Sequence, residues 1–194
     1  MRVALVSRNR DKLRELRELV PGWELELLDT TGIPDETGTT FEENAREKAR
    51  WGRRSAPPDA WVLGEDSGLC VDGLDGGPGI RSARYAGEHA TDRENLERLL
   101  AALEGVEGPG RRARYVCELV LLAPDGREAR GSGTFQGSIA RGPRGEEGFG
   151  YDPVFVPEGQ SQTVAELGDR WKASHSHRAQ AARLLARAVR GSLA

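Results

Sequence analysis

The sequence predicts a mixed α/β fold, and three observations support that prediction. Short apolar runs at residues 3–6 and 61–63 are typical of strands that are buried on both faces of a sheet. Segments with helical spacing of apolar residues alternate with these runs. Two longer β-prone stretches, residues 115–123 and 128–139, are separated by a Pro-Asp-Gly turn and predict a hairpin. The length of 194 residues suits one domain, residues 1–194, or two lobes that share a cleft.

The first strand leads directly into a helix. Polar, turn-forming residues end the apolar run, and Leu13, Leu16 and Leu19 then recur at helical spacing. A Pro-Gly pair ends this helix. Apolar and acidic side chains alternate over residues 23–27, which predicts a half-buried second strand.

Two capping-box patterns predict further helices. Thr40 is followed three residues later by Glu43, so a helix is expected over residues 41–54. Thr91 and Glu94 repeat the pattern and open a helix with four leucines on one face.

The last third of the chain predicts a loop, a strand and a helix. A glycine-rich loop at residues 142–150 leads into a short apolar strand at residues 154–156. A final helix is expected over residues 176–189. Its apolar side would carry Ala181, Leu184, Leu185, Ala188 and Val189.

The composition is that of a soluble globular protein, and the expected location is the cytosol. Charged residues make up 30% of the chain, hydrophobic ones 37%, and the net charge is −3. This balance argues against a nucleic-acid binder, which needs a basic surface. No apolar run approaches the ~20 residues that span a bilayer, and none resembles a signal peptide. Cys70 and Cys117 lie in apolar stretches and predict buried, reduced thiols.

The turn at residues 7–12 is the first candidate for chemistry. A helix N-terminus presents free N–H groups and a positive dipole end, which attract phosphate. Ser7 and Asn9 would add polar contacts, and Lys12 a mobile positive charge. The alternative is an ordinary capped helix start, because the glycines of a Walker loop are absent.

The second candidate is the Glu65-Asp66-Ser67-Gly68 segment, expected at the end of the strand that begins at Trp61. Two adjacent carboxylates near a core need a cation or donors, and oxygen ligands suit Mg²⁺. The alternative is a polar turn that leaves the sheet. Glu43 is a possible third carboxylate, although its position equally fits a residue that caps a helix.

The third candidate combines aromatic residues with hydrogen-bond donors that could sandwich and recognise a base. The alternative assigns each of these residues to the core or the surface. The members are Phe149, Gly150, Tyr151, Asp152, Trp171, Lys172, His175, His177 and Arg178.

Together, these segments resemble the inosine triphosphate pyrophosphatase family, whose bacterial members act on non-standard purine nucleotides. The matching stretches are Ser-Arg-Asn-Arg-Asp-Lys at residue 7, Glu-Thr-Gly-Thr-Thr-Phe-Glu-Glu-Asn-Ala at 36, Glu-Asp-Ser-Gly-Leu at 65, Gly-Pro-Gly-Ile-Arg-Ser-Ala-Arg-Tyr at 77, Gly-Phe-Gly-Tyr-Asp-Pro at 148 and Ser-His-Arg at 176. The resemblance implies an elongated mixed β-sheet with flanking helices, two lobes around a central cleft, and a homodimer. It also implies Mg²⁺-dependent hydrolysis of ITP, dITP and XTP to the monophosphate and pyrophosphate.

The resemblance also implies roles for individual residues. Asp66 would be the catalytic acid–base carboxylate, with Lys12 also catalytic. The metal carboxylates would be Asp66, Glu43 and Glu65. The substrate-binding residues would be Ser7, Arg8, Asn9, Arg10, Asp11, Lys12, Ser67, Phe149, Gly150, Tyr151, Asp152, Lys172, His177 and Arg178. The chain departs from the family pattern at Arg8, where a small residue is usual, and at Glu65, where aspartate is usual.

The implied mechanism is an in-line attack of water on the α-phosphorus, with pyrophosphate leaving. Donors from Lys172, His177 or Arg178 would accept the 6-oxo group of hypoxanthine or xanthine and disfavour the 6-amino group of adenine. Three alternatives remain open: a pyrophosphatase for other modified nucleotides, a nucleotide sensor without catalysis, and a phosphatase that releases orthophosphate.

Overall fold

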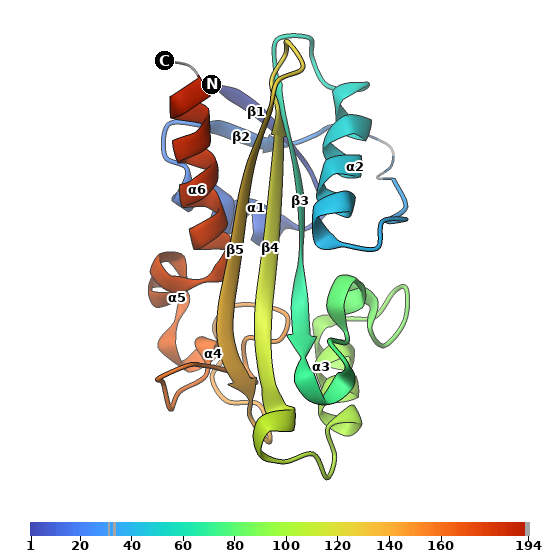
Figure 1. The fold of residues 1–194 in the computed structure, drawn as a ribbon, viewed down its shortest axis with the longest axis vertical. Coiled ribbons are helices and arrows are strands. Elements are labelled where there is room, and N and C mark those ends of the chain that lie inside the picture. Colours follow the sequence, from blue (N-terminus) through green and yellow to red (C-terminus); the bar gives the residue numbers. More distant parts are fainter. Residues whose placement is uncertain (31, 33, 193–194) are drawn as a thin grey trace. The chain divides into compact units, whose positions relative to one another are not determined.

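The computed structural model describes residues 1–30, 32 and 34–192, and Figure 1 shows their fold. The described strands form a six-stranded sheet in the order β2-β1-β3-β4-β5-β6. Strand β1 pairs in parallel with both β2 and β3, whereas β5 and β6 are antiparallel. The sheet is therefore mixed, and the predicted α/β class is confirmed. The strands are β1 (Arg2–Val6), β2 (Glu24–Leu27), β3 (Trp61–Val71), β4 (Arg112–Leu122), β5 (Glu128–Ile139) and β6 (Phe155–Pro157).

The helices alternate with the first strands and then cluster near the C-terminus. The α-helices are α1 (Arg10–Leu19), α2 (Phe41–Arg53), α3 (Asp92–Ala102), α4 (Val164–Leu167), α5 (Asp169–His175) and α6 (His177–Ser192). Short 3₁₀ helices are η1 (Asp72–Leu74), η2 (Gly79–Arg84) and η3 (Gly108–Arg111). None of these described helices has the length and apolar character that crossing a bilayer requires.

The chain divides into two compact units. Among the described residues, the first unit takes residues 1–66, 117–133 and those from 177 onward. The second takes residues 67–116 and 134–176. Strands β3, β4 and β5 contribute residues to both. One functional domain, an elongated shape and a cleft between two lobes stay predictions.

The core of the first unit follows the alternation of side chains along its strands. On β4, Cys117, Leu119 and Leu121 join a cluster with Leu16 of α1 and Leu185 of α6. The intervening side chains point to the opposite face, where Val120 and Leu122 pack against alanines of α2. The sheet of this unit is therefore covered by α1 and α6 on one face and by α2 on the other.

Helix α2 lies directly on β3 because Gly64 has no side chain. A Cβ atom at Gly64 would lie 1.9 Å from the carbonyl oxygen of Ala45 and 2.7 Å from the backbone nitrogen of Ala49. Contacts this short require the helix to move. The position of α2 matters for function because its inward face carries Asn44 and Lys48, both buried.

Replacing Gly64 by alanine is expected to lower the free energy of unfolding by about 1–3 kcal/mol, because the added methyl group displaces α2. Urea unfolding followed by circular dichroism measures the change. Gly142→Ala is the matched control, since no heavy atom lies within 4 Å of its added Cβ. Equal midpoints for the two variants would contradict this close packing.

The core of the second unit gathers on α3 and the adjoining strand segments. Leu96 and Leu99 of α3 and its C-cap residue Leu103 pack in one cluster with Tyr115 of β4 and Phe155 of β6. The centroids of these two rings lie 4.7 Å apart. This packing holds the first half of β4 against the start of β6.

Several sequence predictions are confirmed, and two are corrected. Both capping boxes form, and β4 and β5 follow each other through the predicted turn. The strand from Trp61 does not end in a polar turn: β3 continues to Val71, so Glu65 and Asp66 lie inside a strand. Leu184 is 48% exposed, because the buried stripe of α6 runs through Ala181, Ala182, Leu185 and Val189 and leaves Leu184 on its flank.

Candidate active site

The turn at residues 7–12 folds as a capped helix start. Asn9 is the N-cap residue of α1, and its side-chain oxygen accepts hydrogen bonds from the backbone nitrogens of Asp11 and Lys12 at 2.9 and 3.0 Å. The backbone nitrogen of Asn9 donates to the Ser7 hydroxyl at 3.0 Å. Arg8 and Arg10 are exposed. The turn is therefore the capped helix start that the alternative interpretation predicts. Phosphate binding by this turn stays a prediction.

A buried ion-pair chain connects α1, β3 and α6. Lys12 Nζ lies 2.7 Å from Glu65 Oε2, and Arg178 Nη2 donates to Glu65 Oε1 at 3.0 Å. Arg178 also pairs with Glu15 of α1. Burial alone would raise the pKa of Glu65, but Lys12 and Arg178 outweigh it and hold that pKa well below its usual value. Glu65 is therefore a carboxylate that anchors two cations.

Both cysteines are free thiols and both are buried, as the sequence predicts. Cys117 lies beside Glu65, with its Sγ 3.8 Å from Oε1. Burial raises the pKa of the Cys117 thiol, and the Glu65 charge adds to the effect. The thiol is thus held protonated next to the ion-pair chain.

Asp66 is the centre of a second buried group of polar side chains. Lys48 Nζ lies 2.9 Å from Asp66 Oδ1 and 2.5 Å from Glu36 Oε1. The Asn44 amide donates to Asp66 Oδ2 at 3.1 Å and accepts from the backbone nitrogen of Gly38 at 2.9 Å. Burial raises the pKa of Asp66, and Lys48 opposes that rise only in part. Asp66 is thus a fixed carboxylate with an elevated proton affinity.

Glu43 has a structural role at the start of α2. Its Oε2 accepts from the backbone nitrogen of Thr39 at 2.7 Å, from the Thr39 hydroxyl at 2.8 Å and from the backbone nitrogen of Thr40 at 3.2 Å. Within the described part of the chain, no three or more His, Cys, Asp or Glu side chains are arranged to hold a metal ion. The metal role of Glu43 stays a prediction.

In the second unit, three of the predicted base-binding residues form one cluster around Asp152. Lys172 Nζ lies 2.5 Å from Asp152 Oδ2, and the backbone nitrogen of Phe149 donates to the same oxygen at 2.9 Å. The Lys172 ammonium lies 4.2 Å from the centroid of the Phe149 ring. The structure therefore brings Phe149, Asp152 and Lys172 together, as the sequence predicts.

Tyr151 is a core residue of the same loop. It is 4% exposed, and its hydroxyl donates to the carbonyl oxygen of Ser82 at 2.8 Å. Burial raises the pKa of Tyr151 above its usual value. Of the two aromatic residues expected to stack on a base, Phe149 is the more accessible.

The remaining predicted residues are divided between the units. Ser67 of β3 belongs to the second unit, and His177 and Arg178 begin α6 in the first. Sequence reasoning missed Glu15, Glu36, Asn44 and Lys48. Asn44 and Lys48 are four residues apart on α2, in a row with alanines and a glycine. A polar pair within such a small-residue stripe is a signal that this face is buried around a polar partner.

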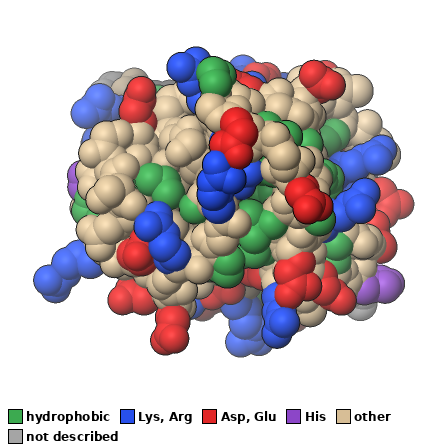
Figure 2. Space-filling view, turned by 90° about the horizontal axis from the view of Figure 1, so that it is seen from below, with side chains coloured by type: hydrophobic (Ala, Val, Ile, Leu, Met, Phe, Trp, Pro, Cys, Tyr) green, Lys and Arg blue, Asp and Glu red, His purple; other side chains and the backbone are tan. Residues whose placement is uncertain are grey.

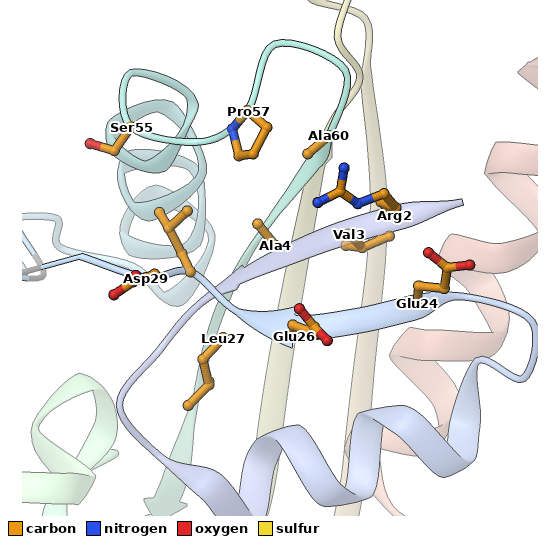
Figure 3. Close-up of a pocket in the computed structure, with 11 residues that line it drawn as sticks. Arg2, Val3, Ala4, Glu24, Glu26, Leu27, Asp29, Ser55, Pro57 and Ala60 are labelled. Atoms are coloured by element: carbon orange, nitrogen blue, oxygen red, sulfur yellow. The ribbon is translucent and has the colours of Figure 1, made fainter.

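A separate hollow of about 310 Å³ lies on the first unit, at the face of β1 and β2 (Figure 3). Its lining includes Arg2, Glu24, Glu26, Asp29 and Ser55. The described residues that line it include none of the predicted site residues. The face of the molecule in Figure 2 shows basic and acidic side chains interspersed, which is typical of a solvated surface.

The protein is thus a mixed α/β protein in which Asp66 and Lys48 form a buried ion pair. The neighbouring Glu65 binds Lys12 at the capped N-terminus of α1. The model of the Ham1 family matches residues 3–188, and the chain belongs to that family. A dITP/XTP pyrophosphatase from Bdellovibrio bacteriovorus is 48% identical over 169 residues, which cover 87% of this chain and 84% of that relative. A dITP/XTP pyrophosphatase from Streptomyces avermitilis is 43% identical and covers 97% of both chains.

Solved structures agree with this assignment. The Ham1 protein of Staphylococcus aureus superposes with a TM-score of 0.85 at 37% identity, over 99% of this chain and 100% of that one. A HAM1 protein from Coxiella burnetii gives a TM-score of 0.85 at 36% identity, over 98% and 99%. The predicted family and fold are confirmed.

Proposed function

We propose that this chain hydrolyses dITP, XTP and ITP to the nucleoside monophosphate and pyrophosphate. The observation that carries the proposal is the buried carboxylate of Asp66, held between Lys48 and Asn44. Its neighbour Glu65 binds Lys12 from the predicted phosphate turn. The relatives named dITP/XTP pyrophosphatase, with up to 48% identity, support the choice of substrate.

We propose Asp66 and Glu36 as the carboxylates for Mg²⁺, in place of Glu43 and Glu65. Glu43 already caps the N-terminus of α2. Glu65 already pairs with the side chains of Lys12 and Arg178. Asp66 and Glu36 instead approach one Lys48 ammonium from two segments of the chain. This oxygen pair fits Mg²⁺, which needs only one or two carboxylates and is completed by waters and phosphates.

In the proposed reaction, Asp66 orients the attacking water and accepts its proton. Asp66 suits a general base because Lys48 and Asn44 hold its carboxylate in one orientation. Lys12 and Lys48 neutralise the charge that builds up on the leaving pyrophosphate. Bound Mg²⁺ would supply further charge neutralisation at the phosphate oxygens.

For the base, we propose that Phe149 stacks and that Lys172 donates to the 6-oxo group. Lys172 is buried and lies next to the Phe149 ring, and this proximity supports a shared role of the two residues in binding one base. Adenine presents a 6-amino donor there, which faces the Lys172 donor without forming a hydrogen bond, and this mismatch costs about 1–3 kcal/mol. Arg178, paired with two carboxylates, is better suited to anchor Glu65 than to contact a base. A homodimer and a cytosolic location stay predictions.

A panel of triphosphates tests the proposed substrate. With Mg²⁺, the kcat/KM for dITP, XTP and ITP is expected to exceed that for ATP by about 5- to 150-fold, with pyrophosphate as product. Excess EDTA is expected to abolish turnover, and added Mg²⁺ to restore it. Equal rates with ATP would contradict the selectivity, and full activity in chelator would contradict the metal role.

A further inference from the structure

Hydrogen bonds and an ion pair hold the loop of residues 148–152 in the second unit at successive residues. The Phe149 nitrogen donates to Asp152, the Tyr151 hydroxyl donates to Ser82, and Asp152 binds Lys172. Between these contacts, the backbone nitrogen of Gly150 donates to Asp92 Oδ2 at 2.7 Å. Asp92 is the first residue of α3 and lies 58 positions away in the sequence.

The backbone of this loop needs such ties because it is unusual. Gly148 and Gly150 have φ values of +80° and +65°, in the left-handed region that favours glycine. A Cβ atom at Gly148 would lie 2.2 Å from Asp152 Oδ2. Glycine allows the backbone to adopt this conformation, but it also gives the loop more conformational freedom. Hydrogen bonds from outside the loop are therefore needed to hold that conformation.

The hydrogen bond between Gly150 and Asp92 is well suited to hold the loop in this conformation. A carboxylate that accepts from a backbone N–H forms a charge-assisted bond, stronger than a neutral one. The capping box of Thr91 and Glu94 fixes the first turn of α3, and Asn95 binds the backbone at Ala83 and Ala86. Asp92 is therefore presented from a fixed position, and its bond to Gly150 acts on the residue next to Phe149.

We propose that Asp92 is a positioning residue for nucleobase binding: through the Gly150 amide it holds the loop that carries Phe149 against Lys172. This inference rests on the proposed function, since it concerns the same base-binding residues. Asp92 itself need not touch the substrate. Its effect should appear in binding of the base, not in the chemistry at the phosphate.

Three variants separate positioning from helix stability. Asp92→Ala removes the acceptor and is expected to raise the KM for ITP by about 3- to 10-fold, with kcat within about 2-fold of wild type. Asp92→Asn keeps an acceptor oxygen and loses only the charge, so it is expected to restore KM to within about 2-fold of wild type. Glu97→Ala, on the exposed face of α3, is the matched control and should leave KM unchanged.

A second measurement on the same variants requires no activity. Hydrogen exchange at the Gly150 amide is expected to accelerate by about 5-fold or more in Asp92→Ala but not in Asp92→Asn. An unchanged exchange rate and KM in Asp92→Ala would overturn the proposal. Equal losses in Asp92→Asn and Asp92→Ala would also overturn it, since charge at the helix start would then be the cause. If wild type released no pyrophosphate from ITP, the proposed function would be wrong. The exchange data would still test whether the Asp92 hydrogen bond holds the loop at Gly150.

Discussion

Asp66→Asn is expected to lower the kcat for pyrophosphate release by about 10²- to 10⁴-fold. The amide has almost the shape of the carboxylate but accepts no proton, so general-base catalysis is lost. It is also a weaker ligand for a hard divalent cation. Steady-state release of pyrophosphate from dITP measures the effect.

The control for this variant is Asp59→Asn. Asp59 is a surface residue of the same unit and is 68% exposed at its side chain, where it pairs with Arg2. It should keep wild-type activity. A folded Asp66→Asn protein with more than about a tenth of wild-type kcat would contradict the role of Asp66 as base.

Arg178→Ala is expected to lower the free energy of unfolding by about 3–5 kcal/mol. The guanidinium is 2% exposed and lies between Glu15 and Glu65, so its loss takes one cation away from the buried Glu65 and from the half-buried Glu15. Burial would then raise the pKa of Glu65, which Arg178 and Lys12 now hold low. Urea unfolding at neutral pH measures the loss.

Arg187→Ala is the matched control, because it removes an exposed arginine from the same helix. Its unfolding midpoint should stay near that of wild type. A small effect of Arg178→Ala, similar to that of the control, would show that the ion-pair chain contributes little to stability.

The elements of the fold were predictable wherever local chemistry determines them. Thr40 and Thr91 open α2 and α3 with capping boxes, because side chain and backbone satisfy each other within one turn. The course of β3 was not predictable in this way. Glu65 and Asp66 interrupt an apolar run, and only their buried cationic partners explain why the strand continues through them.

The site was predictable as a set of segments but not as a set of contacts. The resemblance selected Asp66 and Lys12 by motif, and it implied a role for Lys172 outside the matching stretches. The partners of these residues depend on how distant elements pack: Arg178 and Glu65 are 113 positions apart, and Lys48 and Asp66 are 18 apart. No local pattern encodes such distances, so Glu36 and Lys48 emerged only from the structure.

The most direct test of the central claim is the fate of the water oxygen during hydrolysis of dITP by the wild-type protein with Mg²⁺. In heavy-oxygen water, attack at the α-phosphorus places the label in the nucleoside monophosphate and leaves the released pyrophosphate unlabelled. Mass spectrometry of both products distinguishes the possibilities. Label in pyrophosphate, or release of orthophosphate, would contradict the account.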